Sequence, residues 1–78
     1  MVRRRLYEPI PALVRADEDG RPAALDGIGV EAVREDWVVE DRWWSEQPIR
    51  RHYFALTLRN GRSETVFCES GRWFRQRA

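Results

Sequence analysis

The most strongly patterned part of this chain runs from Val30 to Trp44 and reads VEAVREDWVVEDRWW. The apolar residues at its odd-numbered positions are Val33, Trp37, Val39 and Trp43. The even-numbered positions carry Arg34, Asp36, Glu40 and Arg42, with Val38 and Trp44 as exceptions. This period of two predicts a long β-strand with one buried face. A helix over the first half is disfavoured because β-branched and aromatic residues dominate the second half. A strand of this length usually carries a bulge, which we expect at Glu35-Asp36 or Glu40-Asp41.

The sequence after this strand predicts a three-stranded antiparallel meander. Its strands are expected over residues 51–59, 62–69 and 72–77, after a loop at 45–48. In the first of them Phe54, Leu56 and Leu58 alternate with Tyr53, Thr57 and Arg59, so the former set is expected to point inward. Asn60-Gly61 predicts a type I′ hairpin turn, and Ser70-Gly71 predicts another tight turn. Trp73 and Phe74 are adjacent and should therefore point to opposite faces.

The first third of the chain is less regular. Residues 1–8 are basic and without periodicity, so we expect a flexible arm, followed by a single small β domain over residues 9–78. Short strands are expected at 12–16 and 21–25, joined by a turn at 17–20 and followed by a bend at 26–29. The fold class is therefore all-β, with five to six antiparallel strands. We expect a strongly bent sheet or a small SH3-like open barrel, with a C-terminal three-stranded meander.

Composition narrows the functional classes. The 78 residues contain one cysteine and one histidine, Cys68 and His52, which leaves too few soft ligands for a zinc site within the chain. No nucleophile stands in a known catalytic setting, and neither a calcium loop nor a phosphate-binding glycine loop is present. We therefore expect no enzyme activity, no cofactor, no metal and no small-molecule substrate. Apolar runs are too short to cross a membrane, so a cytoplasmic protein without a membrane partner is expected.

Charge is distributed unevenly along the chain, and all fourteen basic residues are arginine. Residues 1–16 hold four Arg and one Glu (+3), and residues 17–46 hold three Arg and ten acids (−7). Residues 47–78 hold seven Arg and two Glu (+5). Either the basic end forms a binding face, or acidic and basic strands lie side by side and pair across the sheet. We favour pairing for most of these charges.

The pair Trp43-Trp44 is the strongest candidate for a functional feature. Neighbouring residues of a strand point to opposite faces, so both rings cannot enter one core. Either Trp43 is in the core and Trp44 covers another part of the domain, or Trp44 is exposed and anchors a partner. On an outer face its expected neighbours are aromatic and arginine side chains. The predicted binding residues are thus Trp44, Arg50, Arg51, Tyr53, Trp73, Arg75 and Arg77.

The aromatic and turn residues from Trp43-Trp44 to Trp73-Phe74 also carry a family resemblance. Between these pairs, Pro48, the run from Arg51 to Phe54, a glycine turn and the run from Thr65 to Phe67 keep a characteristic order. Over about Val30 to Gln76 the chain resembles the C-terminal module of ImuB-type proteins, catalytically inactive relatives of Y-family DNA polymerases. It also resembles small stand-alone bacterial proteins with the same ending. The resemblance implies a tie to damage-tolerant DNA synthesis, with a docking role for the Trp/Tyr/Arg residues and no polymerase activity.

The sequence supports three functional hypotheses. The first is a non-enzymatic interaction module with a protein partner in a bacterial DNA repair or translesion synthesis assembly. The second is a protein that binds single-stranded nucleic acid directly, through arginines interleaved with aromatic residues. The third is a structural subunit that adds an edge strand to a larger complex.

Overall fold

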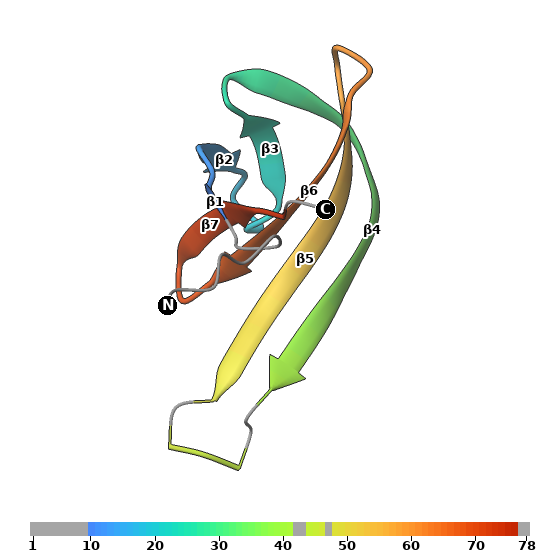
Figure 1. Ribbon diagram of the computed structural model, residues 1–78. Coiled ribbons are helices and arrows are strands. Elements are labelled where there is room, and N and C mark those ends of the chain that lie inside the picture. Colours follow the sequence, from blue (N-terminus) through green and yellow to red (C-terminus); the bar gives the residue numbers. More distant parts are fainter. Residues whose placement is uncertain (1–9, 42–43, 47, 77–78) are drawn as a thin grey trace, which may run out of the picture.

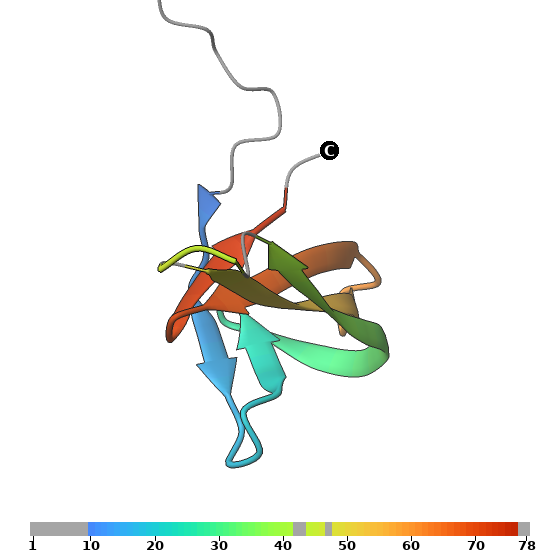
Figure 2. The same ribbon diagram turned by 90° about the horizontal axis from the view of Figure 1, so that it is seen from below.

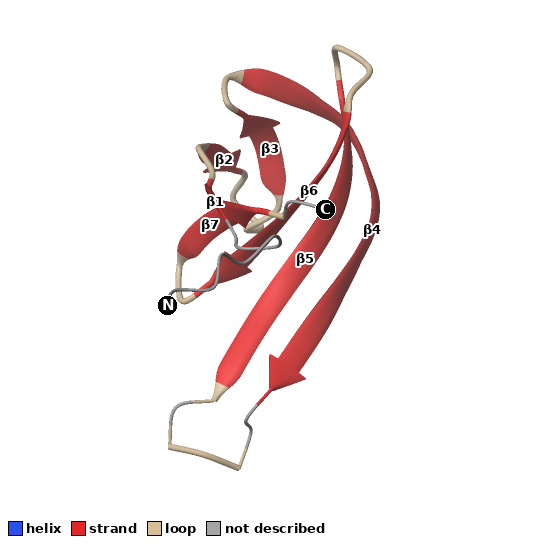
Figure 3. Cartoon of the chain, viewed as in Figure 1, coloured by secondary structure: helices blue, strands red, loops and turns tan. Residues whose placement is uncertain are grey.

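The protein is an all-β domain built from seven strands, as a computed structural model describes for residues 10–41, 44–46 and 48–76 (Figures 1 and 3). The strands are β1 (Ile10–Pro11), β2 (Val14–Ala16), β3 (Pro22–Leu25), β4 (Ile28–Asp41), β5 (Ile49–Leu58), β6 (Ser63–Glu69) and β7 (Arg72–Arg75). All neighbours in the sheet are antiparallel, in the order β1-β7-β6-β5-β4-β3-β2. The described residues form no helix. The predicted all-β class and the C-terminal meander are confirmed, with seven strands in place of five or six.

The extra strand arises because one short segment reaches both edges of the sheet. β1 pairs with β7 and β2 pairs with β3, although only Ala12 and Leu13 separate β1 from β2. The amide of Ala12 donates to the carbonyl of Trp73 at 3.0 Å. The amide of Asp26 donates to the carbonyl of Leu13 at 2.8 Å. Because one segment bonds to both ends, the sheet must curl strongly, and it forms an open half-barrel (Figure 2).

The turns are close in position to those expected, but one differs in type. At Asn60-Gly61 only the glycine has a positive φ (+89°), whereas a type I′ turn needs positive φ at both central residues. Leu58 accepts a hydrogen bond from Gly61 and donates one to Arg62, so three residues form the loop, with a left-handed glycine at its end. The type I′ prediction was therefore wrong here.

Two other turns do have the backbone that a type I′ hairpin requires. Asp26 and Gly27 have φ values of 53° and 82°, and Ser70 and Gly71 have values of 53° and 79°. They join β3 to β4 and β6 to β7 directly, with Leu25 opposite Ile28 in the first case. In a two-residue hairpin connection, positive φ values give the turn a twist that matches the right-handed twist of the strands it joins. Glycine adopts positive φ without a steric penalty.

The long strand β4 contains two register shifts against β5, between Val30 and Ala32 and between Val33 and Glu35. The second adjoins the predicted bulge site at Glu35-Asp36, whereas Glu40-Asp41 shows no shift. Each extra residue exchanges the faces of the strand.

The second shift changes which β4 side chains are buried. Val33 lies opposite Leu56 and packs against the core, whereas Trp37 lies opposite Tyr53 on the other face. Trp37 and Val39 are 39% and 40% exposed. The prediction that these three residues share one buried face was wrong, because the bulge breaks the alternation between them. Trp43, the fourth residue of that pattern, lies outside the described residues.

The core lies on the face of the sheet turned toward the inside of the curl, here called the inner face. Its fully buried side chains come from β3, β5 and β6, and each is at most 2% exposed: Leu25, Phe54, Leu56, Leu58 and Val66. The inward face predicted for β5 is confirmed. Burying each such side chain contributes about 1.5–3 kcal/mol before the entropy cost of folding.

Candidate interaction surfaces

The opposite, outer face carries a row of four aromatic side chains, one from each of β4 to β7. Trp37, Tyr53, Phe67 and Phe74 are consecutive partners in the strand register. Their ring centroids are 5.3, 4.9 and 5.2 Å apart along the row, and Trp37 and Tyr53 are stacked with parallel planes. Phe67 at its centre is fully buried, so this outer-face aromatic row acts as a second, smaller core.

Arg51 is fixed onto this row. Its guanidinium carbon lies 4.7 Å from the centroid of the Phe67 ring, within cation–π range. Its Nε donates to Glu69 Oε1 at 2.8 Å and its Nη1 to the Tyr53 hydroxyl at 3.4 Å. The bond to the Tyr53 hydroxyl, assisted by Glu69 and opposed by partial burial, raises the pKa of Arg51 above its ordinary value. The side chain therefore stabilises the fold, with its charge already compensated.

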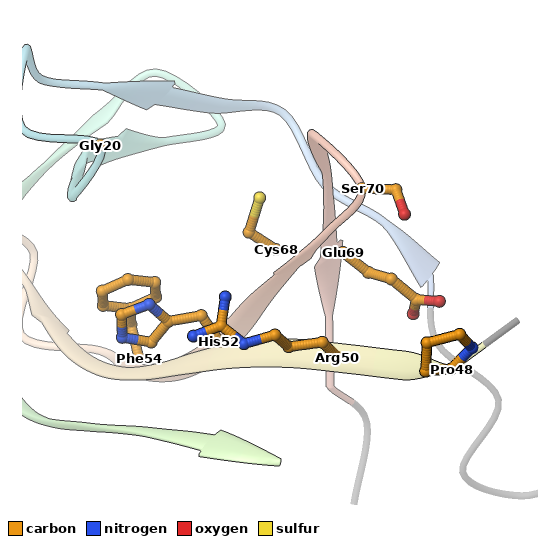
Figure 4. Close-up of a pocket in the computed structure, with 8 residues that line it drawn as sticks. All are labelled: Gly20, Pro48, Arg50, His52, Phe54, Cys68, Glu69 and Ser70. Atoms are coloured by element: carbon orange, nitrogen blue, oxygen red, sulfur yellow. The ribbon is translucent and has the colours of Figure 1, made fainter. Parts of the chain in front are cut away.

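The inner face contains a pocket of about 350 Å³ next to the core (Figure 4). It is lined by Gly20, Pro48, Arg50, His52, Phe54, Cys68, Glu69 and Ser70. The ring of His52 stacks on Phe54 at 4.2 Å, and its Nε2 lies 2.7 Å from Asp36 Oδ2. Cys68 is the register partner of His52, but the described residues show no hydrogen bond between them. No three His, Cys, Asp or Glu residues in the described ranges are grouped to hold a metal ion.

The predicted binding residues do not gather on one face. Tyr53 belongs to the outer face, whereas Trp73 points to the inner face, where its ring lies 5.6 Å from that of Phe54. This separation agrees with the expectation that Trp73 and Phe74 point apart, but it divides the expected platform. Trp44 follows β4 and is 69% exposed, and Arg77 lies outside the described residues.

The arginines of the predicted set that the structure describes all have acidic partners. Arg50 bonds to Glu40, its register partner on β4, at 3.2 Å. Arg51 bonds to Glu69, and Arg75 bonds to Asp26 and lies 3.7 Å from Glu64. Acidic and basic strands thus pair across the sheet, as favoured by the charge pattern.

A surface that the predicted set of binding residues does not include lies along β4. β3 pairs with β4 only through Gly29 and Ile28, so from Val30 to Glu40 no described strand pairs with β4 on the side away from β5. Residues 37–41 and 49–53 form the end of the β4–β5 hairpin, here called the arm, which extends beyond the curled part of the sheet (Figure 1). β6 still pairs with β5 at His52 and Tyr53, so only residues 39–41 and 49–51 of the arm are two-stranded. On this arm Trp37, Val38 and Val39 are 39–43% exposed. We call the unpaired side from Val30 to Glu40 the β4 edge.

A signal for the β4 edge was present in the sequence. Val38 and Val39 are adjacent, so they must point to opposite faces, as was argued for the two tryptophans. One of the two valines therefore had to lie outside a single core. What the sequence could not indicate is that the arm extends past its neighbours and leaves both valines accessible.

The fold and these surfaces define a small all-β domain whose most exposed apolar side chains are not in its pocket. No protein-family model matches the chain, and comparisons with curated proteins and with solved structures also give no match. The described part of the chain holds no helix long and apolar enough to cross a membrane.

Proposed function

We propose that this protein is a non-enzymatic interaction module that docks onto a protein partner through the arm. The observation that carries this proposal is the exposure of Trp37, Val38 and Val39 together on an unpaired strand edge. Single exposed apolar residues are common, but here three consecutive apolar residues of one strand are exposed, and tryptophan is enriched among the residues that dominate binding energy. Trp44, three residues past the end of β4, is also 69% exposed.

Addition of an edge strand to a partner's sheet is the binding mode that the geometry favours. An unpaired edge presents main-chain N–H and C=O groups to a partner strand, and side chains on both faces then supply specificity. For the fold itself we propose a relationship to small SH3-like open barrels. The curled antiparallel sheet and the segment bonded to both of its edges support this assignment.

The cellular setting of the proposal is a bacterial DNA repair or translesion synthesis assembly. This setting rests on the resemblance of residues 30–76 to the C-terminal module of ImuB-type proteins. We also propose a cytoplasmic location, which suits this setting and was expected from the short apolar runs of the sequence.

No specific observation favours direct binding of single-stranded nucleic acid. Arg50, Arg51 and Arg75 each bond to a carboxylate, and Tyr53 and Trp73 lie on opposite faces. A nucleic-acid platform needs free cations beside stacking rings on one surface.

The test compares two matched variants as bait in cell extracts. Val38→Lys places a charge on the arm, and Leu13→Lys places one on a leucine that is 74% exposed between β1 and β2. A partner retained by the wild-type protein and by Leu13→Lys should be lost by Val38→Lys, by about tenfold or more for a hot-spot position. Equal retention by both variants, with both folded by circular dichroism, would contradict docking through the arm.

A further inference from the structure

We infer that the β4 edge binds an extended, basic peptide segment with an apolar centre, which adds to the sheet as a strand. This inference rests on the proposed function and specifies the chemistry of the partner. Three features of the edge support it: its unpaired backbone, its exposed apolar centre and the sign of its charge.

No strand of the described residues pairs with the β4 edge. β4 is held by β5 along its length, but from Val30 to Glu40 no described strand occupies its other side. Main-chain groups on that side are therefore available to a strand from another molecule. Ten residue pairs hold β4 against β5, so the edge is already an ordered strand before a partner binds. This protein therefore loses little conformational entropy on binding.

The exposed apolar residues of the β4 edge require apolar residues in the middle of the partner strand. Trp37 and Val39 project to the outer face, and Val38 projects to the inner face. A strand laid beside β4 places its own side chains next to these on both faces. Valine, isoleucine or threonine in the partner would cover the three exposed apolar side chains and exclude water from the new backbone hydrogen bonds.

The charge sets the flanks of the partner strand. Residues 31–40 hold four carboxylates and one arginine, a net charge of −3. Glu31 and Glu35 form no ion pair with a described residue, while Asp36 and Glu40 keep side chains that are 38% and 59% exposed despite their bonds to β5. Arginine or lysine on the flanks of the partner strand would lie opposite these carboxylates and pair with them. Acidic residues at the same positions of a partner would be destabilising, because like charges would face each other.

The same charges argue against a second copy of this chain as the occupant. An antiparallel pairing of two β4 edges centred between Trp37 and Val38 would set Glu35 against Glu40 in both halves. Charged residues on an exposed edge are a common device against such self-pairing. In this register the two Glu35–Glu40 pairs oppose self-pairing, whereas a basic segment would meet opposite charge at these positions.

The test is an NMR titration of the ¹⁵N-labelled protein with synthetic peptides of about nine residues. The probe alternates arginine and threonine around a Val-Thr-Val centre. One matched peptide replaces its arginines with glutamate, and another carries N-methyl groups on alternate amides, which removes the donors of one strand edge. We expect the basic probe to shift amide signals of Val30–Glu40, and both matched peptides to bind about tenfold more weakly or not at all.

Protein variants test the charge requirement. Glu35→Gln should weaken the basic probe about two- to fivefold, since one cross-strand charge pair is lost. Glu18→Gln, in the turn between β2 and β3, should leave binding unchanged. Raising the salt concentration should weaken the probe because the carboxylates are exposed.

Several outcomes would overturn the inference. These are equal binding of the basic and acidic peptides, binding unaffected by N-methylation, or shifts outside the β4 edge. Shifts of the same amides by a single-stranded oligonucleotide, or by dilution of the free protein, would instead assign the edge to nucleic acid or to a second copy. If the peptides fail while Val38→Lys still abolishes partner capture, docking through the arm stands and only strand addition by a basic segment is refuted.

Discussion

Replacing Phe67 with leucine removes the central ring of the outer-face aromatic row while it keeps an apolar side chain in that place. Phe67 is fully buried although it lies on the face opposite the main core. Its ring contacts those of Tyr53 and Phe74 at centroid distances of 4.9 and 5.2 Å, and the Arg51 guanidinium lies 4.7 Å away. Leucine retains most of the buried area but none of these ring interactions.

The expected loss is worked from those three contacts. Each aromatic pair contributes about 0.5–1.5 kcal/mol beyond burial, and the cation–π contact about 0.5–1 kcal/mol. Phe67→Leu should therefore lower the free energy of unfolding by about 1.5–4 kcal/mol. A domain of 78 residues has a total stability of about 4–12 kcal/mol, so the variant should still fold. With a urea dependence of about 1 kcal/mol per molar, the unfolding midpoint should fall by about 1.5–4 M.

Phe74→Leu is the matched control, because it removes only one ring contact of the row, the one to Phe67. Its expected loss is about 0.5–1.5 kcal/mol. If urea titrations followed by tryptophan fluorescence give Phe67→Leu no larger a loss than Phe74→Leu, the aromatic row is not a second core and the reasoning fails.

Two further pairs of variants test the turns and the ion pairs by the same measurement. Gly27→Ala should cost about 1–2 kcal/mol because φ is +82° there, whereas Gly29→Ala should cost less, since its new Cβ meets only a flexible arginine side chain; equal losses would contradict the turn assignment. Arg75→Ala should cost about 1–3 kcal/mol because it leaves Glu64, only 13% exposed, with one ion-pair partner fewer. Arg50→Ala breaks a bond between exposed groups and should cost less than about 1 kcal/mol, and the reverse order would refute this ranking.

Much of the local structure could be predicted from the sequence. Alternation identified β5 and its inward residues, and glycine-containing pairs marked the hairpins, because side-chain period and positive φ are properties of neighbouring residues. The pairing of acidic with basic strands was also predictable, since Glu40 and Arg50 flank one connection and meet in register.

The candidate site was less predictable than the strands. Trp44 and the arginines were chosen because of their residue types, and the structure divides the described members of that set between two faces and gives the arginines acidic partners. The exposed valines of the β4 edge were overlooked, because alternation alone placed Trp37 and Val39 in the core. A bulge of one residue was enough to reverse that assignment.

The sequence by itself determined that this chain forms short and long β-strands, where most of them turn, and which residues of β5 face inward. Only the tertiary structure decided that residues 10–16 reach both edges of the sheet. It also decided that β4 extends past β3, so that one side of β4 has no partner strand among the described residues. The physical reason is that strand formation depends on residues close in the chain. Exposure of an edge depends on the lengths and bulges of strands that are distant in sequence and meet only after folding.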